Sequence, residues 1–133
     1  MNKLVQGRGG KGSGVIYSIG YQKLDQKRLI EILNAHRVEV LVDVRSRPYG
    51  RIPVFNRNAM ERWLPEAGIG YLWKGDILGG FAPIEDEAIR WLADFGRERT
   101  VCIMCMEADP DKCHRKMEIG RRIEAYGDRV EHL

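Results

Sequence analysis

The sequence predicts a single α/β domain of three layers, with a mostly parallel sheet of about five strands and helices on both faces. Short apolar runs alternate from end to end with longer segments whose apolar residues recur at helical spacing. Two of the runs, 38–44 and 101–106, are largely apolar on both faces, as is typical of parallel strands covered by helices. Helix-length connections between successive strands also favour parallel neighbours.

Local patterns predict the elements in chain order. Residues 1–14, with five glycines, are expected to be a flexible leader before one α/β domain over 15–133. Apolar and β-branched runs predict the strands 15–19, 38–44, 69–73, 100–106 and 130–133. Apolar stripes predict the helices 25–36, 58–67, 85–96 and 110–126. Proline and glycine predict loops over 45–56 and 75–83.

Helix capping gives the last helix its expected start. Asp109 and Pro110 suit its N-cap and first position, which would put Cys113 near the fourth helical position. Lys116 and the other charged residues of this helix are expected to form a solvated face.

Composition narrows the class of protein. The 133 residues suit one domain, and 44% hydrophobic with 31% charged residues is ordinary for a globular protein. The net charge of +3 is too small to indicate nucleic-acid binding by itself. Three cysteines do not suggest a disulfide framework. Because no membrane-spanning run or signal peptide is recognisable, we expect a cytoplasmic protein.

The stretch 101–115 is the strongest candidate for chemistry. It holds every cysteine at the expected junction of a buried strand and a helix, where ligands bind in α/β sheets. A thiol near a helix N-terminus ionises more easily, so Cys105 or Cys113 is a candidate thiolate. Glu107 and His114 are candidates for proton transfer.

Other interpretations of these residues stay open. Cys102 is expected to be a core residue, and for Cys105 and Cys113 core and functional roles are equally compatible with the sequence. A metal site could use both of these cysteines with Glu107 and His114, although the spacing matches no common zinc pattern. A tyrosine-phosphatase loop is disfavoured, because Asp111 stands where its arginine would be.

A second group of candidates follows the strand 38–44. Asp43 is an acid in an apolar strand and needs a partner, which Arg45, Arg115 or backbone N–H groups could supply. The remaining arginines, including Arg47 and Arg51, would then be free to bind an anion, or the whole group could be a structural network under a solvated loop.

Aromatic residues and glycines are expected near the same edge of the sheet. Gly79 and Gly80 allow close approach of a ligand, or simply a tight turn. Aromatic rings there could stack on a base or belong to the core, namely those of Tyr17, Tyr21, Phe55, Tyr71 and Trp73.

These residues, taken together, resemble the domain-of-unknown-function 488 family. The resemblance rests on the runs Tyr17-Ser18-Ile19-Gly20-Tyr21, Leu41 to Pro48 with Arg51 and Phe55, Leu78-Gly79-Gly80, Met104 to Glu107, Cys113-His114-Arg115 and Val130-Glu131-His132. It implies a small bacterial or archaeal α/β protein and no particular reaction. Met106 and Phe81 are mild departures from the pattern, and neither removes a polar group.

The sequence therefore leads to a ranked set of hypotheses. The first is an enzyme with a cysteine thiolate that acts on an anionic substrate, such as a nucleotide or nucleic-acid component. The second is a non-catalytic module that binds a nucleotide or single-stranded nucleic acid, and the third is a Cys/His metal site. No cofactor is expected. The expected catalytic residues are Cys105, Cys113, Glu107 and His114; the expected substrate-binding residues are Tyr17, Tyr21, Asp43, Arg45, Arg51, Gly79, Gly80 and Arg115.

Overall fold

A computed structural model describes residues 15–133, except for the side chains of His114 and Arg115. The leader predicted over 1–14 lies outside the described residues. The strands are β1 Val15–Gly20, β2 Val40–Asp43, β3 Gly70–Trp73, β4 Val101–Cys105 and β5 Arg129–His132. The helices are α2 Gln26–Ala35, α3 Arg57–Glu66, α4 Gly75–Leu78, α5 Asp86–Glu98 and α6 His114–Glu124, with short 3-10 turns η1 Pro53–Phe55 and η2 Pro110–Lys112.

The described strands form one parallel sheet in the order β3-β2-β4-β1-β5. β4 lies in the centre, where Ile103 is aligned with Ser18 of β1 on one side and with Val42 of β2 on the other. All five residues of β4 are buried. The fold class predicted from the alternating pattern is therefore confirmed.

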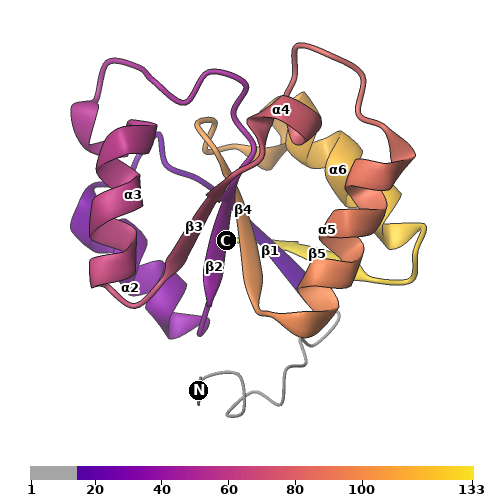
Figure 1. The fold of residues 1–133 in the computed structure, drawn as a ribbon, viewed down its shortest axis with the longest axis horizontal. Helices are drawn as coiled ribbons and strands as arrows, with labels where there is room; N and C mark the ends of the chain where they lie inside the picture. Colours follow the sequence, from indigo (N-terminus) through magenta and orange to yellow (C-terminus); the bar gives the residue numbers. More distant parts are fainter. Residues whose placement is uncertain (1–14) are drawn as a thin grey trace.

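The chain winds across the sheet in two directions. From β1 it moves through α2 to β2 and through α3 to β3, and both helices cover one face (Figure 1). It then returns through α5 to β4 and through α6 to β5 on the opposite face. Right-handed crossovers require this change of face when the direction reverses. β4 lies between β1 and β2 in the sheet. The loop after β4 leads to one face, whereas the loops after β1 and β2 lead to the other. At such a point, where the outgoing loops of neighbouring strands diverge, α/β sheets bind ligands.

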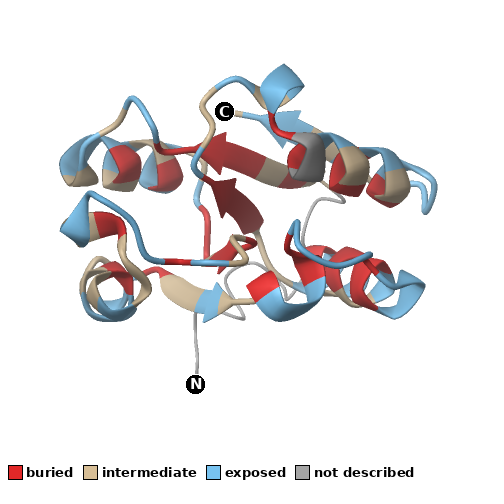
Figure 2. Cartoon of the chain, turned by 90° about the horizontal axis from the view of Figure 1, so that it is seen from above, coloured by how far each residue is buried: buried red, intermediate tan, exposed pale blue. Residues whose placement is uncertain are grey.

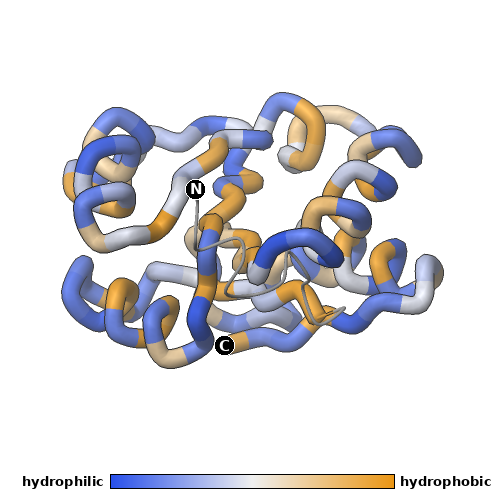
Figure 3. Tube along the Cα trace, turned by 60° about the horizontal axis from the view of Figure 1, so that its bottom comes forward, coloured by the Kyte–Doolittle hydropathy of each residue, from blue (hydrophilic) through white to orange (hydrophobic). Residues whose placement is uncertain are grey.

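Each face of the sheet has its own apolar core. One core packs α5 and α6 against residues such as Val42 and Ile103, and the other packs α2 and α3 against Leu41 and Met104. Buried residues accordingly line the strands and the helix sides that face them (Figure 2). The hydrophobic stretches of the trace run mainly through the middle of the molecule (Figure 3). No described helix is long and apolar enough to cross a membrane.

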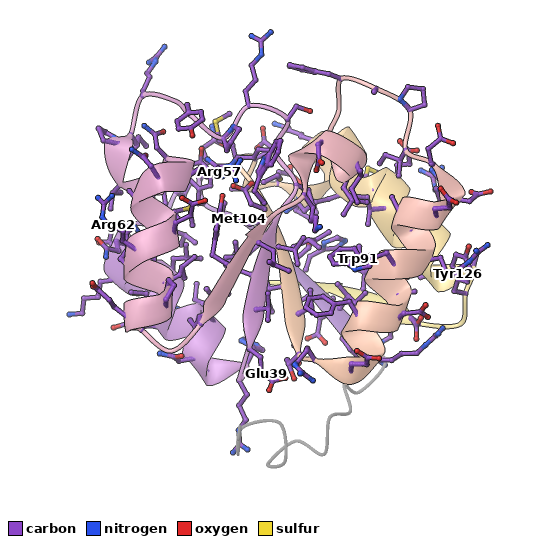
Figure 4. The ribbon with its side chains drawn as sticks, in the orientation of Figure 1. Glu39, Arg57, Arg62, Trp91, Met104 and Tyr126 are labelled. Atoms are coloured by element: carbon purple, nitrogen blue, oxygen red, sulfur yellow. The ribbon has the colours of Figure 1, made fainter. Side chains whose placement is uncertain are left out.

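The amino and carboxyl ends of the strands have different roles. At the amino ends Glu39 accepts a hydrogen bond from the Thr100 N–H at 2.9 Å and ties the starts of β2 and β4 together. Figure 4 places Glu39 at the opposite end of the sheet from Arg57, whose guanidinium lies over the ring of Trp73, the last residue of β3. Met104 and Trp91, also labelled, belong to the two opposite cores.

Two predicted loops contain short helical turns. The loop expected over 75–83 begins with α4, because the Lys74 carbonyl accepts from the Ile77 and Leu78 N–H groups and the Leu78 side chain is fully buried. The loop expected over 45–56 contains η1, which buries Phe55. In both cases burial of one apolar side chain stabilises a turn that proline and glycine content did not indicate.

Candidate active site at the carboxyl ends of the strands

A hollow of about 320 Å³ lies at the carboxyl ends of β1, β2 and β4. Tyr21 contributes from the end of β1, Arg45 and Arg47 from the loop after β2, and Cys105 from the end of β4. Cys113 reaches it from the start of α6. A second hollow of about 610 Å³ shares Tyr21, Gly50 and Met106 with the first and is also lined by Gln22, Arg51 and Ile52. The shared residues show that the two hollows are adjacent.

The sulfurs of Cys105 and Cys113 lie 3.1 Å apart in the first hollow. Both residues are buried, and 8% of Cys105 and 9% of Cys113 is exposed. The Cys105 sulfur also lies 3.7 Å from the backbone carbonyl of Glu107. The structure thus places side by side the two cysteines that the sequence offered as alternative candidates for the thiolate.

Cys113 is the N-cap of α6. Its sulfur accepts a hydrogen bond from the Lys116 N–H at 3.4 Å. The predicted register was wrong here: Asp109 and Pro110 begin η2, where the Asp109 carboxylate accepts from the Asp111 N–H, and the α-helix begins only at His114. A sulfur at the N-cap faces free N–H groups and the positive end of the helix dipole, both of which stabilise a thiolate.

The cysteines differ in their environments. Cys102 is fully buried in mid-strand, as expected for a core residue. Burial raises the pKa of its thiol, and the positive charge of Lys116 lowers it to a smaller extent. The pKa of Cys105 is also raised, first by its hydrogen bond to Cys113, then by burial and by the charge of Cys113. Lys116 and the Glu107 backbone oppose this rise. The raised pKa favours the protonated form of Cys105, and the Cys113 sulfur accepts the hydrogen bond of the Lys116 N–H.

Lys116 is not part of a solvated face. Only 1% of it is exposed, and its ammonium lies close enough to Cys102, Cys105 and His132 to affect their protonation. The available sequence signal was its spacing of three and seven residues from the buried Ile119 and Ile123. A buried ammonium close to the sulfur pair favours negative charge there.

Asp43 finds its partner in Arg45. The Arg45 Nε and Nη2 donate to the two Asp43 oxygens at 2.8 and 2.7 Å, and the Tyr71 hydroxyl donates to Asp43 at 2.5 Å. Arg45 also donates from Nη1 to the Tyr21 hydroxyl at 3.1 Å and from Nη2 to the Phe55 carbonyl at 2.8 Å. The pKa of Tyr71 is raised, first by burial and then by the Asp43 charge.

This network corrects the role expected for Arg45. All three nitrogens of its guanidinium donate to protein acceptors, so it holds Tyr21 and Asp43 in place rather than standing free for an anion. The exposed arginines at the hollows are Arg47 and Arg51. The guanidinium of Arg47 lies 4.9 Å from the ring centre of Phe81, which is itself 72% exposed.

Most of the aromatic candidates make structural contacts within the protein and do not line the hollows. Tyr21 stacks against Phe55 with ring centres 4.4 Å apart, and the Trp73 indole donates to the Arg45 carbonyl at 2.7 Å. Tyr17 packs edge-on against His36 and is absent from the lining of both hollows. Of the aromatic residues proposed from the sequence, only Tyr21 lines a hollow. Its neighbours there are Tyr49 and Phe81, which the sequence did not single out as ligand contacts.

The two glycines have separate positions. Gly80 lines the first hollow. Gly79 is buried, and a Cβ there would lie 2.1 Å from the Ser46 hydroxyl and 2.3 Å from the Gly75 carbonyl. Gly79 therefore allows the loop after α4 to pack tightly on the loop after β2.

Glu107 is close to the sulfurs through its backbone. Its carboxylate accepts from the Asp109 N–H at 3.3 Å, and its carbonyl is the group near Cys105. The side chains of His114 and Arg115 lie outside the description, although both residues begin α6 beside Cys113. Among side chains that are described, no group of three or more His, Cys, Asp or Glu residues could hold a metal ion.

A polar pair that the sequence did not identify joins the neighbouring strands β1 and β5. Ser18 of β1 is fully buried, and its hydroxyl is hydrogen-bonded to Nδ1 of His132 on β5. The two residues are aligned in the sheet. The signal in the sequence was a serine inside an otherwise apolar strand, since a buried hydroxyl needs a partner.

His132 makes stability depend on pH. The pKa of His132 is lowered, first by burial and then by the positive charge of Lys116. The negative charges of Asp111 and Glu124 raise it to a smaller extent. The folded protein thus favours the neutral imidazole of His132. The stability that this preference contributes is fully present above about pH 6.5, the pKa in the unfolded chain, and is lost as the pH falls through the lowered pKa of the folded state. We expect His132→Asn to reduce the drop in Tm between about pH 7 and pH 5, as measured by thermal unfolding. Parallel Tm profiles for the two proteins would contradict this expectation.

Comparison with known protein families identifies the family of this chain. The family model of the domain of unknown function DUF488 matches residues 25–84 and 81–118, which is well over half of the chain. These segments run from the N-cap of α2 to the first turns of α6 and contain Asp43, Arg45, Cys105 and Cys113. No curated protein and no solved structure is significantly similar to the chain.

Proposed function

The chain belongs to the DUF488 family, and we propose that it is a cytoplasmic, cysteine-dependent enzyme acting on an anionic, phosphate-bearing substrate such as a nucleotide or nucleic-acid component. One observation carries the proposal. The sulfur of Cys113 caps α6 at a hollow that exposed Arg47 also lines, so a thiolate and a cation face the same space. That combination suits nucleophilic attack on a substrate held by its negative charge.

The residues take distinct parts in the proposed reaction. Cys113 is the nucleophile, and the Lys116 N–H stabilises its negative charge by donating to the sulfur. The Lys116 ammonium, whose charge opposes the rise in the pKa of the adjacent Cys105, favours negative charge at the same pair. Arg47 and Arg51 bind the anionic group from the rim, together with Arg115 from the first turn of α6. His114 remains the candidate for proton transfer, since the carboxylate of Glu107 is occupied by the loop backbone.

Alkylation of the thiols tests the nucleophile. In the reduced protein we expect iodoacetamide to modify Cys113 first and Cys102 last, because Cys113 opens to the hollow and Cys102 is fully buried. Millimolar phosphate or nucleotide should slow the reaction at Cys113, and Arg47→Ala should weaken this protection. Peptide mass spectrometry against time and pH measures each rate.

Turnover provides the second arm of this test. Among phosphate esters and nucleotides screened as substrates, any turnover should fall by about three orders of magnitude in Cys113→Ser and persist in Cys102→Ser. Turnover that survives in Cys113→Ser, or alkylation that reaches Cys102 before Cys113, would contradict the proposal.

A binding module is the second candidate function. The stacked pair of Arg47 and Phe81, together with Tyr49 at 59% exposure, offers a basic and aromatic surface of the kind that binds single strands. The same variants separate the two functions. Salt-dependent binding of an oligothymidylate that is unchanged in Cys113→Ser and lost in Arg47→Ala, with no turnover of any ester, would favour the binding module.

A further inference from the structure

The candidate site holds two thiols, those of Cys105 and Cys113, and a pair of thiols can carry out a reaction that a single thiol cannot. We propose that Cys105 is the resolving partner of Cys113, so that the pair reduces low-molecular-weight disulfides with anionic substituents and becomes an internal disulfide. This inference rests on the proposed function for the Cys113 thiolate and adds to it a second reaction and a substrate class.

The geometry needs little change to form the bond. The sulfurs are 3.1 Å apart, and a disulfide requires about 2.05 Å, so a shift of about 1 Å suffices. No residue from 106 to 112, which connect the two cysteines, is buried. The connection can therefore move without disturbing either apolar core.

The two sulfurs are also unequal, as successive thiol–disulfide exchange requires. The Cys113 sulfur accepts the N–H of Lys116 and suits the attacking thiolate. The Cys105 sulfur lies 3.1 Å from that of Cys113, and this hydrogen bond, together with burial, raises the pKa of the Cys105 thiol. Cys113 thus attacks first, and Cys105 stays protonated in reserve.

The first step prepares the second. The pKa of Cys105 is raised first by its hydrogen bond to Cys113, then by burial, and then by the negative charge on Cys113. Once Cys113 is bonded to a substrate sulfur, the two influences that come from Cys113 are lost, whereas burial and the opposing charge of Lys116 remain. Cys105 is then easier to deprotonate at the moment when its thiolate is needed.

The reaction balances as two exchanges. The Cys113 thiolate attacks one sulfur of R–S–S–R, which forms a mixed disulfide and releases R–S⁻, and R–S⁻ takes a proton from solvent. Cys105 then loses its proton to solvent, and its thiolate attacks the Cys113 sulfur and releases the second R–S⁻. The substrate disulfide gains two electrons, and the protein dithiol loses them. A low-molecular-weight thiol returns the protein to the dithiol form by the reverse exchanges.

The hollow indicates which disulfides are suitable. Arg47 lines the first hollow together with Cys105 and Cys113, and Arg51 lines the adjacent second hollow. These cations attract carboxylate or phosphate groups on a small disulfide. A large protein disulfide is less suited, because Cys105 and Cys113 are each less than one-tenth exposed.

Oxidised glutathione is the probe for the test. The fully reduced chain is incubated with it, and intact mass and tryptic peptides are recorded over time. We expect the chain to lose two hydrogen atoms and the peptide 100–112 to become linked to the peptide 113–115. Cys102→Ser is the matched control and should form the same link, since Cys102 is buried in the core.

The variants separate this inference from the proposed function. In Cys105→Ser we expect the glutathione adduct on Cys113 to accumulate, with one glutathione released per chain, whereas the wild-type protein should release two. A stable adduct on Cys113 in the wild type, without an internal link, would overturn the dithiol reaction and leave the Cys113 nucleophile intact. If Cys113 acquires neither an adduct nor an internal link in either protein, both the dithiol reaction and the Cys113 nucleophile are overturned. The wild-type measurement stands alone if Cys105→Ser does not fold.

Discussion

Replacing Asp43 by Asn is expected to lower the free energy of unfolding by about 3–5 kcal/mol, the cost of leaving one partner of a buried ion pair alone. Asp43 is fully buried and the Arg45 side chain is only 8% exposed. The variant keeps the shape of the side chain but removes the charge that faces the guanidinium, and it turns an acceptor oxygen into a donor. Urea unfolding monitored by fluorescence measures the change.

An exposed pair on α2 provides the control for this prediction. Arg28 and Glu31 form an ion pair at 3.3 Å with side chains 61% and 48% exposed. Glu31→Gln should change the free energy of unfolding by no more than about 1 kcal/mol. If Asp43→Asn were no more destabilising than Glu31→Gln, the Asp43–Arg45 network would not be the structural support that we infer.

Replacing Gly20 by Ala is expected to have the second large effect, of about 1–3 kcal/mol, because the site loop packs directly on the backbone at Gly20. A Cβ at Gly20 would lie 1.8 Å from the Glu107 carbonyl oxygen and 2.8 Å from the Ala108 Cα. Both contacts are with backbone, so no side chain can turn away to relieve them. The connection between Cys105 and Cys113 must move instead.

The site should therefore change along with stability. In Gly20→Ala we expect faster alkylation of Cys105, since its contact with the Glu107 carbonyl is broken, together with a lower urea midpoint. Gly50→Ala is the control, because nothing lies within 4 Å of a Cβ at that position. Equal alkylation rates and urea midpoints in the two variants would show that the loop does not depend on the close approach at Gly20.

Much of the fold could be predicted because it depends on local pattern. The apolar runs that became β2 and β4 indicated a parallel sheet, and the order of strands and helices followed the alternation. The convergence of Tyr21, Arg47 and Cys105 at one edge also followed from topology, since parallel strands all end on the same side. Register near the last helix was predicted wrongly, because Asp109 is a good cap for a 3-10 turn as well as for an α-helix.

The partners of the charged groups could not be predicted. Arg45 was a candidate anion ligand until the structure showed its guanidinium directed at Asp43, Tyr21 and Phe55. Lys116 looked like a surface residue although it is buried beside the cysteines. Ser18 and His132 are 114 positions apart in the chain and meet only because β1 and β5 are neighbours.

The sequence by itself determined the fold class, the family resemblance and the edge of the sheet where chemistry is concentrated, because hydrophobic periodicity and short-range turn chemistry are properties of neighbouring residues. Only the tertiary structure decided that Cys105 and Cys113 face each other, that Arg45 is a structural partner and that Lys116 lies beside the sulfurs. These facts depend on strand order and on burial, which bring together residues from distant segments and set which charges must be paired.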